Sequence, residues 1–318
     1  MKLQMSMLCA AVTMTGLLVL ASCKDDTVTR SNGQLSLYLT DSPVDRADVQ
    51  AVVVTIAEVR LDGQAWEGFD GPLTVDLLSY QGGMTKLMGS SEADAKTYSD
   101  IDLVLDLEQD ASGNTPGCYV MTEDQMQHAL SASGATELLI NIDHSAFSVE
   151  DSQESNLVID FDLRKSITYA SGNSDFAFTT NSELNSALRL VSRDNTGEIE
   201  GQCDDAVNTS DLIVVYAYAK GTYNQSVEPE GQGASQIRFA NAVTSSSVDG
   251  TGHYKLSFLE SGDYELVFAS YAEQSDGTMM LQGTLLLDTL LNIDLQSISV
   301  AGNASVEVDV LVTGLLPL

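Results

Sequence analysis

The sequence predicts an all-β chain: two β-sandwich domains in tandem behind an N-terminal signal peptide, with one short helix in the first domain. Segments in which apolar and polar residues alternate recur along the chain, as expected of half-buried strands. They are separated by turn-forming stretches such as Asp-Asn-Thr-Gly at 194–197. A repeat of roughly 20–50 residues, the signature of solenoids and propellers, is absent from the sequence.

The first domain is expected over residues 34–195. Residues 35–40 and 101–107 alternate with a period of two, and residues 52–61 are rich in β-branched side chains. The latter strand is expected to be buried on both faces for part of its length. Further strands are predicted at 138–142 and 157–163.

The one helix is expected over residues 122–134. Thr122 and Gln125 have the spacing of a capping box, and Gly134 can end the helix. Its apolar face is narrow and consists of Met126, Ala129 and Leu130. Such a face is suited to packing on a sheet.

The second domain is expected over residues 196–318. Residues 212–219 form an apolar, β-rich strand, and residues 223–236 an exposed loop. Apolar and polar side chains alternate in residues 254–258 and 264–268. Each of these segments begins with the tyrosine of a Gly-x-Tyr sequence, and a Ser-Gly-Asp turn joins them. This pattern predicts a hairpin. A final strand is predicted over 300–312.

The first 22 residues have the three parts of an export signal. Lys2 supplies the positive charge, an apolar run follows, and small residues precede Cys23. The apolar run, from Met5 to Leu20, is shorter than the roughly 20 residues of a membrane span. Leu20-Ala21-Ser22-Cys23 resembles the lipobox of bacterial lipoproteins. That resemblance implies cleavage before Cys23 and its acylation, followed by a polar tether over 23–33.

The partner implied by this signal is membrane lipid, held through the acyl chains on Cys23. Lys24, rather than an aspartate, follows the cysteine, which resembles sorting to the outer membrane. Lys-Asp-Asp at 24–26 also resembles a signal for export to the outer face. We therefore expect an outer-membrane lipoprotein, on either the periplasmic or the cell-surface face.

The net charge of the chain limits the classes of molecule that it could bind. Without the signal peptide the chain has 46 acidic and 13 basic side chains, a net charge near −33. Nucleic acid is excluded as a partner because its binding needs a basic surface. The acidity fits solubility, or calcium binding by Asp-rich loops. No Asp-x-Asp-x-Asp-Gly loop is present, and Asp249-Gly250 and Asp276-Gly277 fit ordinary hairpin turns, so no metal or other cofactor is expected.

Cys118 and Cys203 remain in the exported chain, 85 positions apart. Disulfides persist in the oxidising bacterial envelope, and a bridge here would close a long loop. The alternative is two free thiols too far apart to meet, since sequence does not give their separation. Both interpretations stay open at this stage.

No residue pattern indicates catalysis. The three histidines, His128, His144 and His253, are scattered, and neither a His-Glu-x-x-His nor a Gly-x-Ser-x-Gly motif occurs. We therefore predict that the protein is not an enzyme and name no catalytic residue.

Trp66, the only tryptophan, is a candidate ligand contact if it is exposed at a sandwich edge, whereas packing in the core is its more common role. Asp162, Arg164 and Lys165 alternate with apolar residues and are interpreted as a solvated strand face. Asp41, before Ser-Pro, is expected to cap a turn.

Several motifs resemble a family of exported bacterial proteins known as domain of unknown function 4382, over about residues 33–195. They are Leu-Thr-Asp-Ser-Pro at 39–43, the strand at 53–61 with Trp66 after it, Val-Asp-Leu-Leu at 75–78, Tyr-Ser-x-Ile at 98–101, Ile-Asp-Phe-Asp-Leu-Arg-Lys-Ser-Ile at 159–167 and Leu-Arg-Leu-Val at 188–191. The segment Gly117–Gly134 departs from the family as an insertion. The pattern at 250–268 is similar to the transthyretin-like β-sandwich found beside carboxypeptidases. Neither family supplies an active site.

Two functional hypotheses follow. The first is a membrane-anchored binding or adhesion module for a glycan or a protein. The second is a structural accessory lipoprotein of an envelope complex, with no external ligand. Exposed aromatic side chains around Trp66 and Tyr38 would favour the first, and an unpaired apolar edge strand the second.

Overall fold

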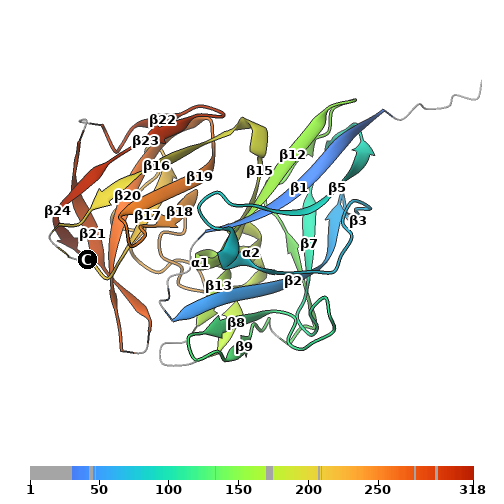
Figure 1. Ribbon diagram of the computed structural model, residues 1–318, viewed down its shortest axis with the longest axis horizontal. Helices are drawn as coiled ribbons and strands as arrows, with labels where there is room; N and C mark the ends of the chain where they lie inside the picture. Colours follow the sequence, from blue (N-terminus) through green and yellow to red (C-terminus); the bar gives the residue numbers. More distant parts are fainter. Residues whose placement is uncertain are drawn as a thin grey trace, which may run out of the picture. The chain divides into compact units, whose positions relative to one another are not determined.

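The computed structural model describes residues 31–42, 46, 48–132, 134–169, 175–206, 208, 210–275, 277–290 and 293–318, with the side chain of Ser42 excepted. The predicted signal peptide, Cys23 and most of the tether lie outside the described residues. In Figure 1 the strands fall into two groups, one blue to green and one orange to red. We refer to residues 32–195 as the first half and to 196–318 as the second half.

The first half contains two main sheets. A four-stranded sheet has the order β15-β12-β1-β5, in which β1 and β12 are parallel and the other pairs are antiparallel. Its strands are β1 (Asn32–Ser42), β5 (Lys86–Asp94), β12 (Glu154–Asp162) and β15 (Leu188–Ser192). A seven-stranded sheet has the order β10-β7-β2-β8-β9, with β3 and β4 also paired to β2. Its strands are β2 (Val49–Leu61), β3 (Gln64–Ala65), β4 (Leu73–Asp76), β7 (Ile101–Asp106), β8 (Tyr119–Thr122), β9 (Gln127–Ala129) and β10 (Glu137–Asn141).

Alternation along β1 explains how this half closes. Leu35, Leu37 and Leu39 are fully buried and pack in one core with side chains of the seven-stranded sheet. The predicted strands at 35–40, 52–61, 101–107, 138–142 and 157–163 are all present, and β2 is buried on both faces over its middle. Smaller elements complete the half: η1 (Leu77–Tyr80), β6 (Thr97–Tyr98), β11 (Phe147–Ser148), α1 (Leu163–Ser166), β13 (Ile167–Tyr169), β14 (Phe176–Phe178), α2 (Asn181–Ala187) and η2 (Arg193–Asn195).

The helix predicted over 122–134 is wrong. The segment is a β-hairpin, β8–β9, and β8 pairs with β2. Thr122 donates a hydrogen bond to Asp124 at 2.7 Å, and Gln125 has a φ of 64°, so the predicted capping residues form a turn. A capping box does occur at α2, between Thr180 and Glu183.

The second half is a nine-stranded sheet with the order β18-β17-β20-β21-β24-β16-β19, to which β22 and β23 add at the side. Its strands are β16 (Thr196–Asp204), β17 (Leu212–Ala219), β18 (Thr244–Ser247), β19 (His253–Glu260), β20 (Gly262–Glu273), β21 (Met279–Thr289), β22 (Ile298–Val300), β23 (Ser305–Glu307) and β24 (Val310–Pro317). The predicted strand at 212–219 is confirmed, whereas the single strand predicted over 300–312 is divided among β22, β23 and β24.

The hairpin predicted from the two Gly-x-Tyr strands is wrong in its pairing. Both strands exist, but β19 pairs with β16, and β20 pairs with β17, β21 and β22. Tyr254 of β19 and Phe268 of β20 meet edge to face, with ring centroids 5.3 Å apart, inside one core. The two strands therefore face each other across the core, and their matching apolar patterns reflect that shared core.

The loop after β17 covers the outer side of the second sheet. Phe239 is fully buried and stacks on Tyr216 of β17, with centroids 4.2 Å apart. Glu228, in the stretch predicted to be exposed, is 1% exposed and accepts hydrogen bonds from Tyr218 and Asn241. These hydrogen bonds hold the loop on the sheet, so the loop can form one side of the contact between the halves.

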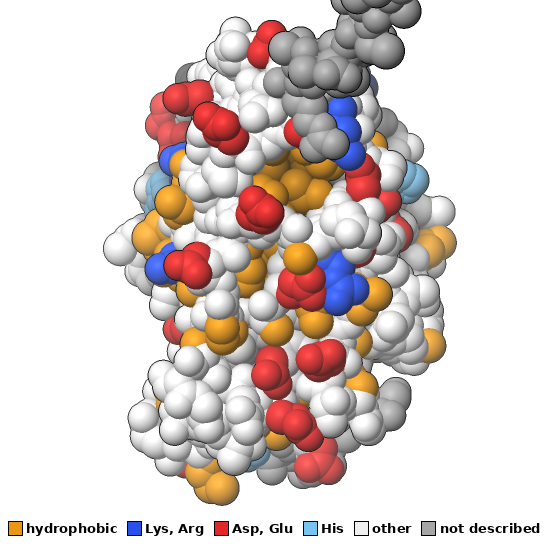
Figure 2. All heavy atoms as spheres, turned by 90° about the vertical axis from the view of Figure 1, so that its right-hand side faces the viewer, with side chains coloured by type: hydrophobic (Ala, Val, Ile, Leu, Met, Phe, Trp, Pro, Cys, Tyr) orange, Lys and Arg blue, Asp and Glu red, His pale blue; other side chains and the backbone are white. Residues whose placement is uncertain are grey.

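The all-β prediction is confirmed by the sheet order and the cores: two main sheets pack around one core in the first half, and strands of one sheet face each other across a core in the second. Residues 31–318 form one compact unit. The domain boundary at 195/196 stays a prediction. On the face shown in Figure 2, acidic side chains are scattered and basic ones are few.

Candidate functional site

The acidic and basic residues of the Ile159–Ile167 motif are buried between the halves. Asp160 is 4% exposed, and its Oδ2 lies 2.9 Å from Nε and 2.7 Å from Nη2 of Arg189. Asp162 lies 3.1 Å from Arg164 and 3.3 Å from Lys165. Burial alone would raise the pKa of Asp162, but the two cations lower it below its usual value. The sequence interpretation of Asp162, Arg164 and Lys165 as a solvated face is therefore wrong.

The basic side chains of these pairs bind backbone carbonyls of the second half. Arg164 donates to the carbonyl oxygen of Arg238 at 2.5 Å, and Lys165 to that of Ala242 at 2.6 Å. Both carbonyls belong to the loop that covers β17. We call Arg164, Lys165 and Arg189 the interface cations. Hydrogen bonds from charged donors are the strong ones, so these contacts fix the loop.

Arg189 binds the second half at a β-bulge. The register of β19 against β16 shifts here, so that Ser257 and Phe258 together lie opposite Glu198. Such a bulge leaves backbone groups outside the ladder. Arg189 donates to the carbonyl oxygen of Phe258 at 2.7 Å and to that of Ser257 at 3.3 Å. Phe258 has a φ of 57°, a strained conformation for an aromatic residue, and this strain lies beside a pocket.

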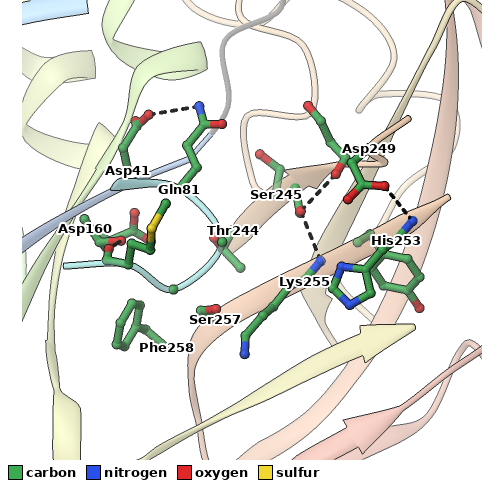
Figure 3. A pocket seen from close by; sticks show the side chains of 17 residues that line it. Asp41, Gln81, Asp160, Thr244, Ser245, Asp249, His253, Lys255, Ser257 and Phe258 are labelled. Atoms are coloured by element: carbon green, nitrogen blue, oxygen red, sulfur yellow. Dashed lines mark hydrogen bonds between the residues drawn. The ribbon is translucent and has the colours of Figure 1, made fainter. Parts of the chain in front are cut away.

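That pocket, which we call the interface pocket, has a volume of about 440 Å³. Asp41 and Gln81 lie on one side, and Thr244, Ser245 and His253 on the other (Figure 3). The remaining lining residues are Thr40, Gly82, Gly83, Met84, Asp160, Ser246, Ser247, Asp249, Tyr254, Lys255, Ser257 and Phe258. Each half supplies a wall, so the interface cations hold the two walls of the pocket in place.

Three residues that line the interface pocket each have a buried side-chain oxygen without a hydrogen-bond partner: Asp41 Oδ1, Ser245 Oγ and Ser257 Oγ. Asp41 is 6% exposed and Ser245 is 5% exposed. Buried polar atoms in folded proteins are nearly always bonded, and leaving one unbonded costs about 1–3 kcal/mol. Unbonded atoms gathered at one pocket are the feature expected of a site that binds a polar ligand.

Asp41 is the most perturbed carboxyl group of the pocket. Burial raises its pKa well above the usual value, the nearby Asp160 and Asp162 raise it further, and a hydrogen bond from Gln81 at 3.2 Å opposes them. Its protonated form is a donor as well as an acceptor. The turn that Asp41 was expected to cap includes residues outside the described part of the chain, so that role stays a prediction.

We expect the Asp41→Asn variant to gain stability relative to the wild-type chain as pH rises from 4 to 7. Unfolded Asp41 loses its proton near pH 3.9, whereas folded Asp41 keeps it to higher pH. In that window the folded state binds more protons, so rising pH lowers the free energy of unfolding. Asparagine removes this dependence. The measurement is urea unfolding of both proteins at each pH.

Asp62 provides a control of opposite sign. A hydrogen bond from Lys96 at 2.5 Å and another from the backbone of Ser99 lower the pKa of Asp62 to about 2. The contribution of ionised Asp62 to the free energy of unfolding is present above pH ~4 and is lost as pH falls towards 2. Asp62→Asn should therefore lose most relative to wild type at the higher pH. If both variants changed in the same direction, the assignment for Asp41 would be wrong.

Neither Trp66 nor the two cysteines, the other candidate site residues from the sequence, line this pocket. Trp66 is 7% exposed and belongs to the core of the first half, so the ligand-contact interpretation is wrong and the core interpretation holds. Cys118 and Cys203 are free thiols buried in different cores, so of the two interpretations left open by the sequence the disulfide is not formed. Cys118 instead accepts a hydrogen bond from the backbone of Thr55 at 3.4 Å.

Both thiols should resist alkylation in the folded protein. Burial raises the pKa of Cys118 and of Cys203 to about 12, and only the thiolate reacts. We expect iodoacetamide at pH 8 to leave both unlabelled until urea unfolds the chain, and a reductant to leave the unfolding temperature unchanged. Peptide mapping without reductant that recovered a bridged pair would contradict this account.

Within the described residues, no group of three or more His, Cys, Asp or Glu side chains could hold a metal ion. Asp249 accepts hydrogen bonds from the backbones of Thr251 and His253, as in an ordinary turn. None of the helices in the same residues has the length and hydrophobicity needed to cross a bilayer.

Sequence reasoning missed the pocket because its residues come from loops and strand ends far apart in the chain. Two local signals could have drawn attention to it. One is the hydroxyl-rich run Thr-Ser-Ser-Ser at 244–247, and the other is Gly82-Gly83, where both residues have positive φ.

Comparison with known families identifies part of the chain. Residues 32–180 match the family model described as "Domain of unknown function (DUF4382)". This confirms the resemblance of the first half, although the match ends before Arg189. It includes Asp41, Gln81 and the Asp160–Lys165 segment. No curated protein matches the chain. The transthyretin-like resemblance of the second half stays a prediction.

Solved structures resemble the chain weakly. The Bacillus anthracis TIE protein is 9% identical, with 89% of this chain and 34% of that chain covered and a TM-score of 0.19. BcpA, the major pilin subunit of Bacillus cereus, is 12% identical over 89% of this chain and 71% of its own, with a TM-score of 0.21. The minor pilin of Streptococcus agalactiae is 13% identical over 89% and 98%, with a TM-score of 0.19. These scores are too low to support any argument about function.

Proposed function

We propose that the protein is a lipid-anchored, non-enzymatic binding module of the bacterial cell envelope, which takes a glycan in the interface pocket. The observation that carries this proposal is that Asp41, Ser245 and Ser257, each with a buried oxygen that has no hydrogen-bond partner, line one pocket with a wall from each half. A pocket of about 440 Å³ lies within the roughly 300–1,000 Å³ typical of small-ligand sites.

The pocket chemistry favours binding over catalysis. A serine nucleophile needs a general base within hydrogen-bond reach, and the hydroxyl groups of Ser245 and Ser257 have no such partner. Burial raises the pKa of the Asp41 carboxyl group well above its usual value, and neither serine hydroxyl group forms a hydrogen bond with it. A sugar needs donors, acceptors and an apolar surface, which the hydroxyl groups, Gln81 and the ring of Phe258 provide.

A glycan array tests the binding proposal. The full-length chain in detergent should bind a subset of glycans, and Ser247→Trp, which places a large ring in the pocket wall, should abolish that binding. Ser112→Trp is the matched control, because Ser112 lies in an exposed turn outside the pocket. An array without a single bound glycan, or equal binding by Ser247→Trp, would refute the proposal.

Anchoring through acylated Cys23 at the outer membrane is part of the same proposal, supported by the signal sequence. Protease treatment of intact cells separates its two faces. Loss of the protein while a periplasmic marker survives would mean the cell surface, and survival of both would mean the periplasm. Cys23→Ala should release the protein from the membrane fraction in either case.

A structural accessory role is the second candidate, and a specific observation favours it. Half of the large exposed apolar side chains within the described chain lie on or after β21 and β24: Met280, Leu286, Leu290, Leu316 and Leu318. Within the described residues, β24 pairs with β16 only at Val310 and Leu311. Most of this edge of β24 therefore has no partner strand. Leu286→Ser with Leu316→Ser should then release an envelope partner from crosslinked cells, while glycan binding is unchanged.

A further inference from the structure

A second hollow adjoins the interface pocket. It has a volume of about 350 Å³ and is bounded on its far side by residues of η2, β16 and the loop before β23. Gly83, Lys255, Ser257 and Phe258 line both hollows. The bulge in β19 therefore lies at the junction, with one hollow on each side of it. A ligand longer than one sugar ring could pass this junction.

Several charged groups in the two hollows already have a partner within the chain. Lys255 Nζ lies 2.8 Å from Glu198 and 3.7 Å from Glu200. Asp160 is paired with Arg189. In the second hollow, the Arg193 guanidinium lies over the ring of Tyr38, 4.6 Å from its centroid. A charged ligand would therefore meet few unpaired side chains of opposite charge in the hollows.

The rest of the lining offers neutral hydrogen-bonding groups. Thr244–Ser247 supply hydroxyl groups to the first hollow, and Asn303 and Ser305 supply an amide and a hydroxyl group to the second. The chain as a whole has a formal net charge of −32, which repels anionic ligands at ranges up to about 8 Å in physiological salt. Acidic sugars are disfavoured both locally and at long range.

We infer that the ligand is a neutral oligosaccharide of two or more sugar rings, which lies across both hollows and passes the junction at Gly83. This inference rests on the proposed function and names its ligand class. Side chains line the hollows, whereas an extended peptide is usually held by an open sheet edge. A peptide ligand is therefore an outcome that the test below would detect.

Gly83 allows a sharp test because a matched glycine lies outside both hollows. Gly113 and Gly83 have φ values of 83° and 86°, so alanine strains the backbone at either position. A Cβ atom on Gly83 would lie 2.7 Å from Ser257 Oγ and 3.5 Å from Lys255 Cε, at the junction. A Cβ atom on Gly113 would have no neighbour within 4 Å. Gly113→Ala therefore controls for backbone strain without altering the pocket or the junction.

The experiment is calorimetric titration of the full-length chain in detergent with malto-, cello-, xylo- and laminari-oligosaccharides of one to six sugars, and with oligogalacturonates of the same lengths. We expect affinity for one neutral series to rise with length beyond the monosaccharide. Gly83→Ala should weaken binding of the longer members by roughly tenfold or more, whereas Gly113→Ala should bind them like wild type.

Three results would overturn the inference. They are affinity that does not rise beyond the monosaccharide, equal effects of the two alanine variants, and tighter binding of oligogalacturonates or of a peptide than of every neutral series. The proposed function would survive a flat length dependence, equal effects of the two alanine variants, or tighter binding of oligogalacturonates, provided that Ser247→Trp still abolished glycan binding. Loss of the Ser247→Trp effect would remove the proposed function itself.

Discussion

Replacing Arg189 by methionine is expected to destabilise the folded chain by about 3–5 kcal/mol, because it removes the cation paired with buried Asp160. The variant also loses the hydrogen bonds to the carbonyl groups of Ser257 and Phe258. The measurement is urea unfolding at pH 7. A second variant, Asp160→Asn with Arg189→Met, should recover part of the loss, since it removes the buried charge as well.

The matched control for this prediction is Arg60→Met. Arg60 also pairs with a carboxylate, Glu58 at 2.8 Å, but both side chains are 34% exposed. Exposed ion pairs contribute little to stability, so this variant should unfold like wild type. Equal effects of Arg189→Met and Arg60→Met would mean that the interface cations do not hold the halves together.

Trp66→Ala is expected to cost about 3–5 kcal/mol, the usual range for removing a large aromatic side chain from a core. The backbones of Gly68 and Gly89 pack closely on the indole, since a Cβ atom on either would lie within 3.1 Å of the ring. Neighbours this close leave a cavity when the ring is removed.

Trp66→Phe separates a core role from a ligand role. The indole nitrogen has no hydrogen-bond partner, so phenylalanine keeps most of the packing and removes a buried unbonded donor. We expect a change in the free energy of unfolding within about 1.5 kcal/mol, with unchanged glycan binding. Wild-type stability of Trp66→Ala together with lost binding would restore the ligand-contact interpretation.

Period-two alternation predicted most strands because one face of each is buried. In β1, the fully buried Leu35, Leu37 and Leu39 alternate with less buried neighbours. Strand pairing could not be predicted in the same way. The patterns around Tyr254 and Phe268 look like a hairpin, but an apolar face specifies only that a core lies beside it.

Short polar motifs were the least informative part of the sequence. Thr122 with Gln125 and Thr180 with Glu183 both have capping-box spacing, and only the second pair begins a helix. The first segment is drawn into the edge of a sheet by its pairing with β2. Tertiary pairing therefore overrides a local signal of about 1 kcal/mol.

The candidate site was the part that sequence reasoning could not assemble. Asp162, Arg164 and Lys165 are charged residues between apolar ones, the pattern of a solvated strand face. The partners of Arg164 and Lys165 in the second half are backbone carbonyl groups about 75 residues away, and a carbonyl group carries no sequence signal. Only the fold shows that these cations hold the second wall of the interface pocket.

Titration of the wild-type chain, Ser247→Trp and Ser112→Trp with the strongest glycan from the array tests whether that glycan binds in the interface pocket. We expect equal affinities for the wild type and Ser112→Trp, and loss of binding in Ser247→Trp at unchanged unfolding temperature. Equal affinities of all three proteins would contradict the account, because the glycan would then bind outside the interface pocket.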